Sequence, residues 1–374
     1  MAIEIKEVSS RKLMREFIHL PAKIHQNHFN WVPPIYMDEW TYFDSKKNHA
    51  FDHCTTILYV AEKAGEIVGR IMGIISHQYN ESHKIKDVRF CYLETYEDSE
   101  VFSALIDAVS VWARNHGMNR IVGPLGFSDK DPQGWLIEGY NEPIVIATNC
   151  NFPYSNKLAE ELLFTKEVDL VVYRIPIPEE IPEFYKSIYK RFISRENKLQ
   201  LREFTSRRQV KPYIYKVLTL VNLTFSGIYG FVPFTLKEMD DFANRYLYLI
   251  NPRFIKLVLD EKDEVVAFLI AMSHISDGIQ KSKGYLLPLG FISILTAGRK
   301  SKQLNLLLGG IDPEYQGRGL DVMMGIKLIE SAKRAGKTIM DSHLELEHNL
   351  KVRAEMEKMG GQVYKRYRIY QKAL

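Results

Sequence analysis

The residues of this chain best suited to chemistry lie in a short glycine-rich turn, Gln316-Gly317-Arg318-Gly319. The apolar run 304–308 before the turn predicts a buried strand, and the periodic segment 322–335 after it predicts a helix. At such a junction, backbone N–H groups and the positive end of the helix dipole can hold a phosphate. Glycine allows close approach of the backbone, and Arg318 adds a cation. The turn therefore predicts a ligand that carries a pyrophosphate.

The composition excludes several classes of protein. The 374 residues include 50 Lys+Arg and 46 Asp+Glu, and the basic residues are scattered, so nucleic acid is not expected as a partner. The three cysteines show neither ligand nor disulfide spacing, which favours a reducing compartment. No signal peptide is visible, and the apolar segment 286–297 is too short to cross a bilayer. We therefore expect a cytoplasmic protein without a membrane span.

The chain also repeats itself. Segment 3–12 aligns with 199–208 without a gap and with three identical positions, and each copy predicts a strand, a Ser or Thr cap and a helix. Further pairs follow in the same order: the hairpins 58–69 and 256–267, the helices 101–117 and 320–336, and the closing strands 173–175 and 367–369. We infer two tandem domains, unit one (1–178) and unit two (179–374), joined near the proline-rich segment 176–182.

Each unit is predicted to run strand, helices, hairpin, strand, helix, strand, helix, strand. This order gives an α/β fold with a mixed sheet. The units differ at the junction before the central helix, because unit one has the acidic segment 95–100 where unit two has the glycine turn. Acidic residues cap a helix well but repel a phosphate. At most one phosphate turn per chain is expected.

With Gln316 to Asp321 preceded by Pro313-Glu314-Tyr315, unit two resembles the GCN5-related N-acetyltransferase (GNAT) superfamily of acyl-CoA-dependent acyltransferases. The family motif there is Gln/Arg-x-x-Gly-x-Gly/Ala, and the internal repeat extends the resemblance to unit one. The resemblance implies acetyl-CoA or another acyl-CoA as co-substrate, no metal, and direct attack of an amine on the thioester. It implies coenzyme contacts from Gly310, Ile311, Gln316, Gly317, Arg318, Gly319, Leu320 and Asn349.

Two positions depart from the family pattern. Asp321 stands where glycine or alanine is usual, and its carboxylate opposes a pyrophosphate unless it points away or is paired. Met356 stands where a tyrosine usually protonates the leaving thiolate, so any acid must come from elsewhere, such as Tyr364 or Tyr367, or the thiolate leaves without one. The family's strand bulge, which helps to bind the oxyanion, is expected at the two glycines of 308–311.

A general base is expected in segment 343–348. On a strand, His343, Glu345 and Glu347 share one face, and Glu345 is the preferred base. The alternative is a polar, half-exposed strand face. A metal site is not expected there, and the helically spaced pairs His25/His28 and His49/His53 are expected to be ordinary histidines.

The acceptor is expected to be a small-molecule or peptide amine. Loop 123–140 is unlike anything in unit two, and it predicts an acceptor pocket with Ser128, Asp129 and Glu138. Segment 151–156 follows and adds Tyr154. The alternative for the loop is an Ω-loop that packs the interface between units. For the whole chain, a non-catalytic ligand-binding or scaffold protein and a tandem transferase acting on peptides or lipids also stay open.

Overall fold

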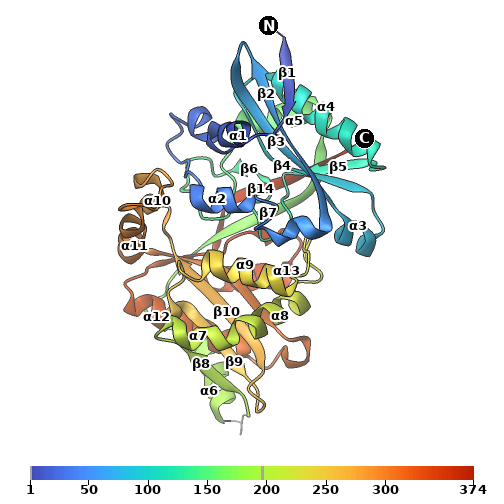
Figure 1. The fold of residues 1–374 in the computed structure, drawn as a ribbon. Helices are drawn as coiled ribbons and strands as arrows, with labels where there is room; N and C mark the ends of the chain where they lie inside the picture. The colour runs from blue at the N-terminus through green and yellow to red at the C-terminus, as the bar shows by residue number, and fades with distance from the viewer. Residues whose placement is uncertain (1, 195–197) are drawn as a thin grey trace.

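The computed structural model describes residues 2–194 and 198–374. Within these residues the strands form one mixed, 14-stranded sheet that runs the length of the molecule (Figure 1). The strands are β1 (Ile3–Glu7), β2 (Cys54–Lys63), β3 (Glu66–Ser76), β4 (Asp87–Thr95), β5 (Arg120–Gly123), β6 (Trp135–Glu138), β7 (Thr165–Pro176), β8 (Gln200–Glu203), β9 (Ile255–Leu259), β10 (Val265–Ser273), β11 (Gln303–Ile311), β12 (Ile339–Asp341), β13 (Glu345–Leu346) and β14 (Gln362–Ala373).

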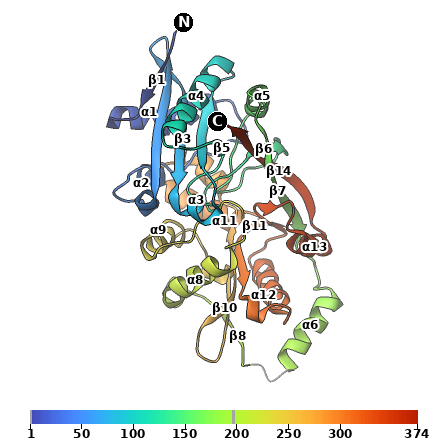
Figure 2. The same cartoon turned by 90° about the vertical axis from the view of Figure 1, so that its right-hand side faces the viewer.

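Helices cover the sheet and occur at matching places in the two halves of the chain (Figures 1 and 2). They are α1 (Arg11–Ile24), α2 (Tyr36–Tyr42), α3 (His77–His83), α4 (Ser99–Asn115), α5 (Pro153–Glu161), α6 (Glu183–Ser194), α7 (Arg207–Val210), α8 (Ile214–Thr224), α9 (Leu236–Tyr246), α10 (Ser276–Lys281), α11 (Gly290–Lys300), α12 (Leu320–Arg334) and α13 (Leu350–Lys358). Short 3-10 turns add His49–His53, Lys211–Tyr213, Pro252–Phe254 and Pro313–Tyr315.

The repeat predicted from the sequence is present in the structure. β1 and β8 occupy corresponding places, Ser10 caps α1, and Ser206 forms a capping box at α7. The hairpin β2–β3 matches β9–β10, α4 matches α12, and β7 matches β14 as closing strands.

The two closing strands join the halves of the chain. The strand order is β1-β2-β3-β4-β5-β14-β7-β12-β11-β10-β9-β8, so β14 pairs with β5 of the first half and β7 pairs with β12 of the second. β14 and β7 also pair with each other along most of their length. Hydrogen bonds of the sheet therefore cross the predicted boundary at 178/179, and neither half completes its own sheet.

Each half contains one pair of parallel strands that diverge. β4 pairs with β5 only over Asp87–Arg89, and β11 pairs with β12 only over Gln303–Asn305. Beyond these short ladders, β4 and β11 continue without that neighbour. Both strands are also irregular on their other side, where the registers of β3–β4 and β10–β11 shift. The sheet is thus opened once in each half, at equivalent positions.

The bulge of β11 does not lie at the two glycines of 308–311, where the sequence predicts it. Ile270 pairs with Leu308 and Ala271 with Leu306, which leaves Leu307 as the extra residue. Gly310 instead pairs regularly with Phe268, and a Cβ there would lie 2.7 Å from Thr224 Oγ1. Close packing against α8 and the Phe268 ring therefore explains this glycine.

Candidate functional site

The glycine turn has the backbone geometry that a phosphate site requires. Gly317 and Gly319 both have positive φ, 72° and 82°, and α12 begins directly after them at Leu320. Among the described residues, the N–H groups of Gly317, Arg318 and Gly319 have no hydrogen-bond acceptor. The Arg318 guanidinium donates to the carbonyl oxygen of Glu314 at 2.8 Å. The turn thus offers free N–H donors at a helix N-terminus.

The equivalent junction of the first half is already occupied. The Asp98 carboxylate accepts from the N–H groups of Glu100 and Val101 at 3.1 and 3.2 Å, and it is paired with Lys63 Nζ at 2.7 Å. The hydrogen bond from Lys63 is the main cause that lowers the pKa of Asp98. A bound phosphate would have to displace this carboxylate, so the turn before α12 is the better anion site.

Several residues of the second half that the sequence analysis singled out are engaged in other ways. Asn349 caps α13 by accepting from the Val352 N–H. The Tyr364 hydroxyl donates to Asp341, and the guanidinium carbon of Arg174 lies 4.1 Å from the centre of the Tyr364 ring. Burial is the first cause that raises the pKa of Tyr364 above its usual range. A tyrosine held in this way is a poor proton donor to a thiolate.

Segment 343–348 forms only a short strand. His343 has a positive φ of 60°, which interrupts the extended backbone between β12 and β13. β13 therefore contains only Glu345 and Leu346. The three polar side chains therefore do not share one continuous strand face. β13 pairs with β7 on the side of the sheet where β11 diverges. Burial alone raises the pKa of Glu345 to about 8.

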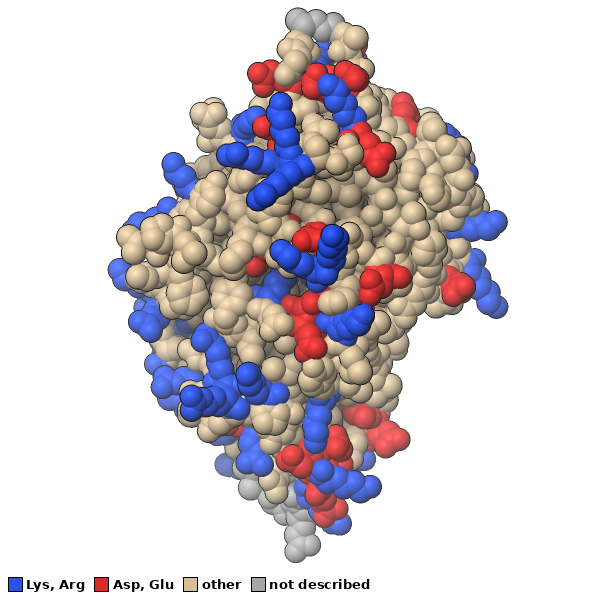
Figure 3. All heavy atoms as spheres, viewed as in Figure 1, with Lys and Arg blue, Asp and Glu red and all other residues tan. Residues whose placement is uncertain are grey.

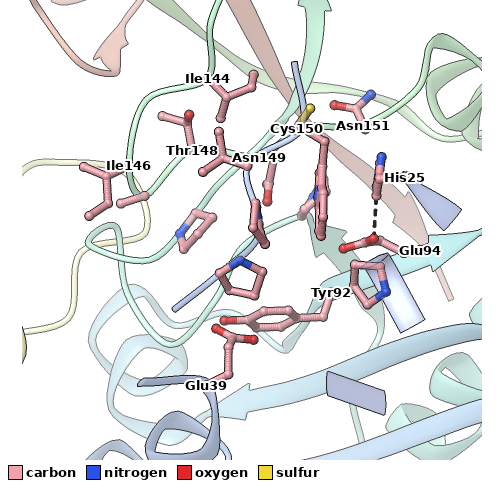
Figure 4. A pocket seen from close by; sticks show the side chains of 18 of the residues that line it. His25, Glu39, Tyr92, Glu94, Ile144, Ile146, Thr148, Asn149, Cys150 and Asn151 are labelled. Atoms are coloured by element: carbon pink, nitrogen blue, oxygen red, sulfur yellow. Dashed lines mark hydrogen bonds and ion pairs between the residues drawn. The ribbon is translucent and has the colours of Figure 1, made fainter. Parts of the chain in front are cut away.

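A cavity of about 190 Å³ lies beside the free edge of β4, and we call it the β4 pocket. Tyr92 to Thr95 of β4 form its floor, and Trp31 to Ile35, before α2, form one wall. Segment 144–152 forms the opposite wall (Figure 4). Leu249 and Ile279 come from the second half of the chain, so the pocket lies between the halves. Its walls are mostly apolar and its floor is polar.

Glu94 and Glu39 both line the β4 pocket, and their environments differ. Glu94 accepts from Arg70 Nη2 at 2.8 Å and lies 3.2 Å from His25 Nε2. Burial alone would raise the pKa of Glu94, but Arg70 and His25 hold it at about 2. Glu39, on α2, is only 5% exposed, and its Oε2 atom has no hydrogen-bond partner. Burial raises the pKa of Glu39 to about 7.

A histidine pair connects Glu94 to a thiol. The Nδ1 atoms of His25 and His28 are 2.9 Å apart, and Cys150 Sγ lies 3.9 Å from both ring nitrogens of His28. His25 is stacked between the rings of Trp31 and Phe152. Burial lowers the pKa of His28 to about 4 and raises that of Cys150 to about 12, so both are neutral at pH 7. Compared with Glu94, His28 and Cys150, Glu39 has the pKa nearest to neutral pH.

The expected acceptor residues are dispersed. Tyr154 lines the β4 pocket and donates to the Thr95 carbonyl at 2.7 Å, whereas Ser128 lines a second cavity of about 350 Å³ between α2 and α9. Asp129 is buried in an ion pair with Lys130 at 2.7 Å. Glu138 lies outside both cavities and pairs with Arg366. Loop 123–140 is also less irregular than expected, because it contains β6, which pairs with β14.

The polar floor of the β4 pocket was not predicted from the sequence. The helical spacing of His25 and His28 was visible, but Glu94 comes from a strand 69 residues after His25. Nothing in the sequence connects Glu39 with Glu94 or with the histidine pair. Of the residues described, no group of three or more His, Cys, Asp or Glu could hold a metal ion, and no helix in ranges 2–194 and 198–374 is long and apolar enough to cross a membrane.

Arg70→Met is expected to destabilise the protein by about 3 kcal/mol, because it leaves Glu94, whose side chain is 26% exposed, without its main partner. The double variant Arg70→Met/Glu94→Gln should recover part of this loss. Since the folded pKa of Glu94 lies below its usual 4.5, its contribution to stability is present above that pH and is lost as the pH falls toward 2. Urea unfolding between pH 3 and 7 measures both effects. Equal stability of the single and double variants would show that Arg70 does not neutralise Glu94.

Known proteins resemble the chain along nearly its whole length, although no protein-family model matches it. The bacterial ceramide synthase of Caulobacter vibrioides is 28% identical over 371 residues, 96% of this chain and 95% of that protein. Protein YghO of Escherichia coli (strain K12) is 25% identical over 369 residues, 96% of this chain and 93% of that protein.

Solved structures share the fold at low sequence identity. A tandem GNAT protein from the clavulanic acid biosynthesis pathway has a TM-score of 0.58 at 10% identity, covering 100% of this chain and 98% of that chain. Its tandem character agrees with the duplicated halves described above. The chain therefore has the tandem fold of the GCN5-related N-acetyltransferases.

Proposed function

We propose that this protein is an acyl-CoA-dependent N-acyltransferase that forms an amide on an amine with a long alkyl chain. The observation that carries the proposal is Glu39, a buried carboxylate with an unpartnered oxygen in a pocket with apolar walls. An unpaired buried carboxylate is costly and is a common sign of a functional site. A cationic head group supplies the missing partner, and an alkyl chain suits the walls.

The apolar part of the acceptor would lie against the walls of the β4 pocket. Pro33, Ile35, Ile144, Ile146 and Leu249 supply aliphatic surface around the polar floor. Burying a chain there gains roughly 0.8 kcal/mol per CH2 group, which favours long-chain amines over short ones. Glu94 does not compete for the ammonium, because it is already paired with Arg70.

The acyl donor would bind through the second half of the chain. Its pyrophosphate would accept from the free N–H groups of the glycine turn, and its arm would follow β11 where β11 diverges from β12. Ile146 joins this region to the acceptor, because it lines the β4 pocket and packs against the same hydrophobic cluster as Leu307 and Leu308 of the β11 bulge. Segment 144–149 would thus border both the donor and the acceptor.

The proposed reaction balances without a metal or an oxidant. Ionised Glu39 receives the ammonium and takes one proton, which frees the nitrogen lone pair. The nitrogen attacks the thioester carbonyl carbon, the C–N bond forms, and the C–S bond breaks to release the coenzyme A thiolate. The nitrogen then loses its second proton to solvent, which leaves the neutral amide. Solvent protonates the thiolate, because the Tyr364 hydroxyl is held by Asp341. Glu39 returns its proton to solvent before the next turnover.

The Caulobacter relative supports this choice of substrate over the alternatives. Its name states ceramide as the product, and a ceramide is a fatty acyl amide of a long-chain amino alcohol. A purely scaffolding role gives no reason for an unpartnered carboxylate in the pocket. The side chain of a peptide amine such as lysine does not require the extensive aliphatic surface that lines the β4 pocket.

A matrix of donors and acceptors tests the proposal. Purified protein is incubated with acetyl-, palmitoyl- or no acyl-CoA and with a long-chain amino alcohol, a short amine or a lysine peptide, and amides are measured by mass spectrometry. We expect amide formation on the long-chain amine at least about tenfold faster than on the short amine, following the chain-burial gain. Amide on the peptide alone would overturn the acceptor assignment. If no donor and acceptor pair gives an amide, the proposed acyltransferase activity is wrong.

A further inference from the structure

An exposed apolar surface borders the β4 pocket. It consists of the turn between α10 and α11 and the start of α11, with Leu287 80%, Leu289 67% and Ile292 59% exposed. Phe29, in a neighbouring loop, is 90% exposed. Isolated apolar residues are common on protein surfaces, but a contiguous group of large ones marks an interaction site. We call this surface the α10–α11 tip, defined as residues 285–292 with Phe29.

Basic side chains flank the tip. Lys281 and Lys283 precede it, Arg299 and Lys300 end α11, and all four are exposed. Among the described residues none of the four has an ion-pair partner, and Asp277 is the one acidic residue in 276–300. The left edge of Figure 3, where Figure 1 places α10 and α11, is largely uncharged, with Lys and Arg at its border. An apolar tip between unpaired cations is the pattern of segments that bind anionic membrane surfaces.

The tip is connected directly to the pocket. Ile279, at the end of α10, lines the β4 pocket. The Tyr285 and Tyr36 rings lie 4.9 Å apart, and the Tyr36 N–H donates to the carbonyl oxygen of Gly284 at 3.1 Å. Gln280 Nε2 donates to the Trp31 carbonyl at 2.7 Å, and Trp31 forms a pocket wall. The exposed apolar surface and the pocket wall are therefore parts of one packed unit.

We propose that the α10–α11 tip docks on an anionic lipid bilayer, so that a long-chain amine passes from the membrane into the β4 pocket. The lipid surface is favoured over a protein partner because four exposed cations, against the single acidic residue Asp277, accompany the exposed apolar residues of 276–300. Docking rests on the proposed function for its purpose, but the binding itself can be measured without any reaction.

Vesicle co-sedimentation tests the docking. The full-length protein is mixed with vesicles of phosphatidylcholine, or of phosphatidylcholine with about one third phosphatidylglycerol. We expect binding to the anionic vesicles at least about tenfold stronger than to the neutral ones, with about fivefold lost for each cation removed by Lys281→Gln or Lys300→Gln. Leu287→Asp/Leu289→Asp should abolish binding, whereas Leu236→Asp, at another exposed leucine, should not change it. Binding of the double variant at the wild-type level would overturn the proposal.

A second readout separates this inference from the proposed function. The Leu287→Asp/Leu289→Asp variant should acylate a micellar long-chain amine at the wild-type rate but acylate the vesicle-embedded amine at least about tenfold more slowly, because only the membrane step is lost. Vesicle binding without any acylation would contradict the proposed function and still support membrane docking. Wild-type protein that dimerises through the tip and ignores vesicles would identify a subunit interface and overturn the docking.

Discussion

Glu39→Gln is expected to lower kcat/KM for a long-chain amine by about 100- to 10,000-fold, the range usually lost with a general base. Glutamine keeps the size and polarity of the side chain on α2 but cannot take a proton or pair with an ammonium. The wild-type profile of kcat/KM should rise with pH through about 7, where Glu39 ionises, and this limb should be absent from the variant. Product formation measured by mass spectrometry from pH 5.5 to 9 checks both statements.

The same variant should be more stable than wild type at high pH. Glu39 keeps its proton up to about pH 7 in the folded state, whereas in the unfolded state it ionises near the usual 4.5. The folded state therefore binds more protons between these pH values, and wild-type stability falls as the pH rises through them. At pH 8 the variant avoids this cost and should gain up to roughly 3 kcal/mol in the free energy of unfolding. A gain in stability with loss of activity is the signature of a functional buried charge.

Two controls make the Glu39 result interpretable. Glu81→Gln changes an exposed carboxylate on α3 and should leave activity and stability unchanged. Glu345→Gln removes another carboxylate whose pKa is raised, the general base expected from the sequence. If Glu345→Gln abolishes the reaction and Glu39→Gln does not, the base lies beside β11 and the assignment of Glu39 is wrong.

Gly317→Glu is expected to weaken coenzyme A binding by about 30- to 100-fold. The positive φ of 72° costs a non-glycine residue about 1–2 kcal/mol, and the added carboxylate repels the pyrophosphate. Gly317→Ala isolates the backbone cost, because a Cβ there has no neighbour within 4 Å, and it should lose about tenfold. Asp321→Asn removes a like charge from the first turn of α12 and should tighten binding about three- to tenfold. Calorimetry with coenzyme A at fixed salt measures all three.

Gly325→Ala is the matched control for the turn. It lies in the same helix, has ordinary φ, and a Cβ there also has no neighbour within 4 Å. Coenzyme affinity should be unchanged, and stability should rise by about 0.5–1 kcal/mol. Unchanged affinity in Gly317→Glu would exclude the turn as the pyrophosphate site and direct attention to the junction capped by Asp98.

The sequence by itself determined the local features of this protein. Strand and helix periods, the caps at Ser10 and Ser206, and the glycines 317 and 319 act within a few residues of each other, so they can be recognised along the chain. The internal repeat then implied that both halves share one fold, and the structure confirms it. The bulge of β11 was wrongly predicted at Gly310, because this glycine is required by close packing against Phe268 and Thr224, which are distant in sequence.

Only the tertiary structure decided how the halves combine and where the pocket lies. The exchange that places β14 between β5 and β7 leaves no mark on the periodicity of either strand. The β4 pocket brings together Glu39 from α2, Glu94 from β4 and segment 144–149, and the pKa of each acid depends on neighbours from other elements. Burial and pairing are properties of three-dimensional packing, which is why two glutamates indistinguishable in the sequence titrate at about 7 and about 2 in the fold.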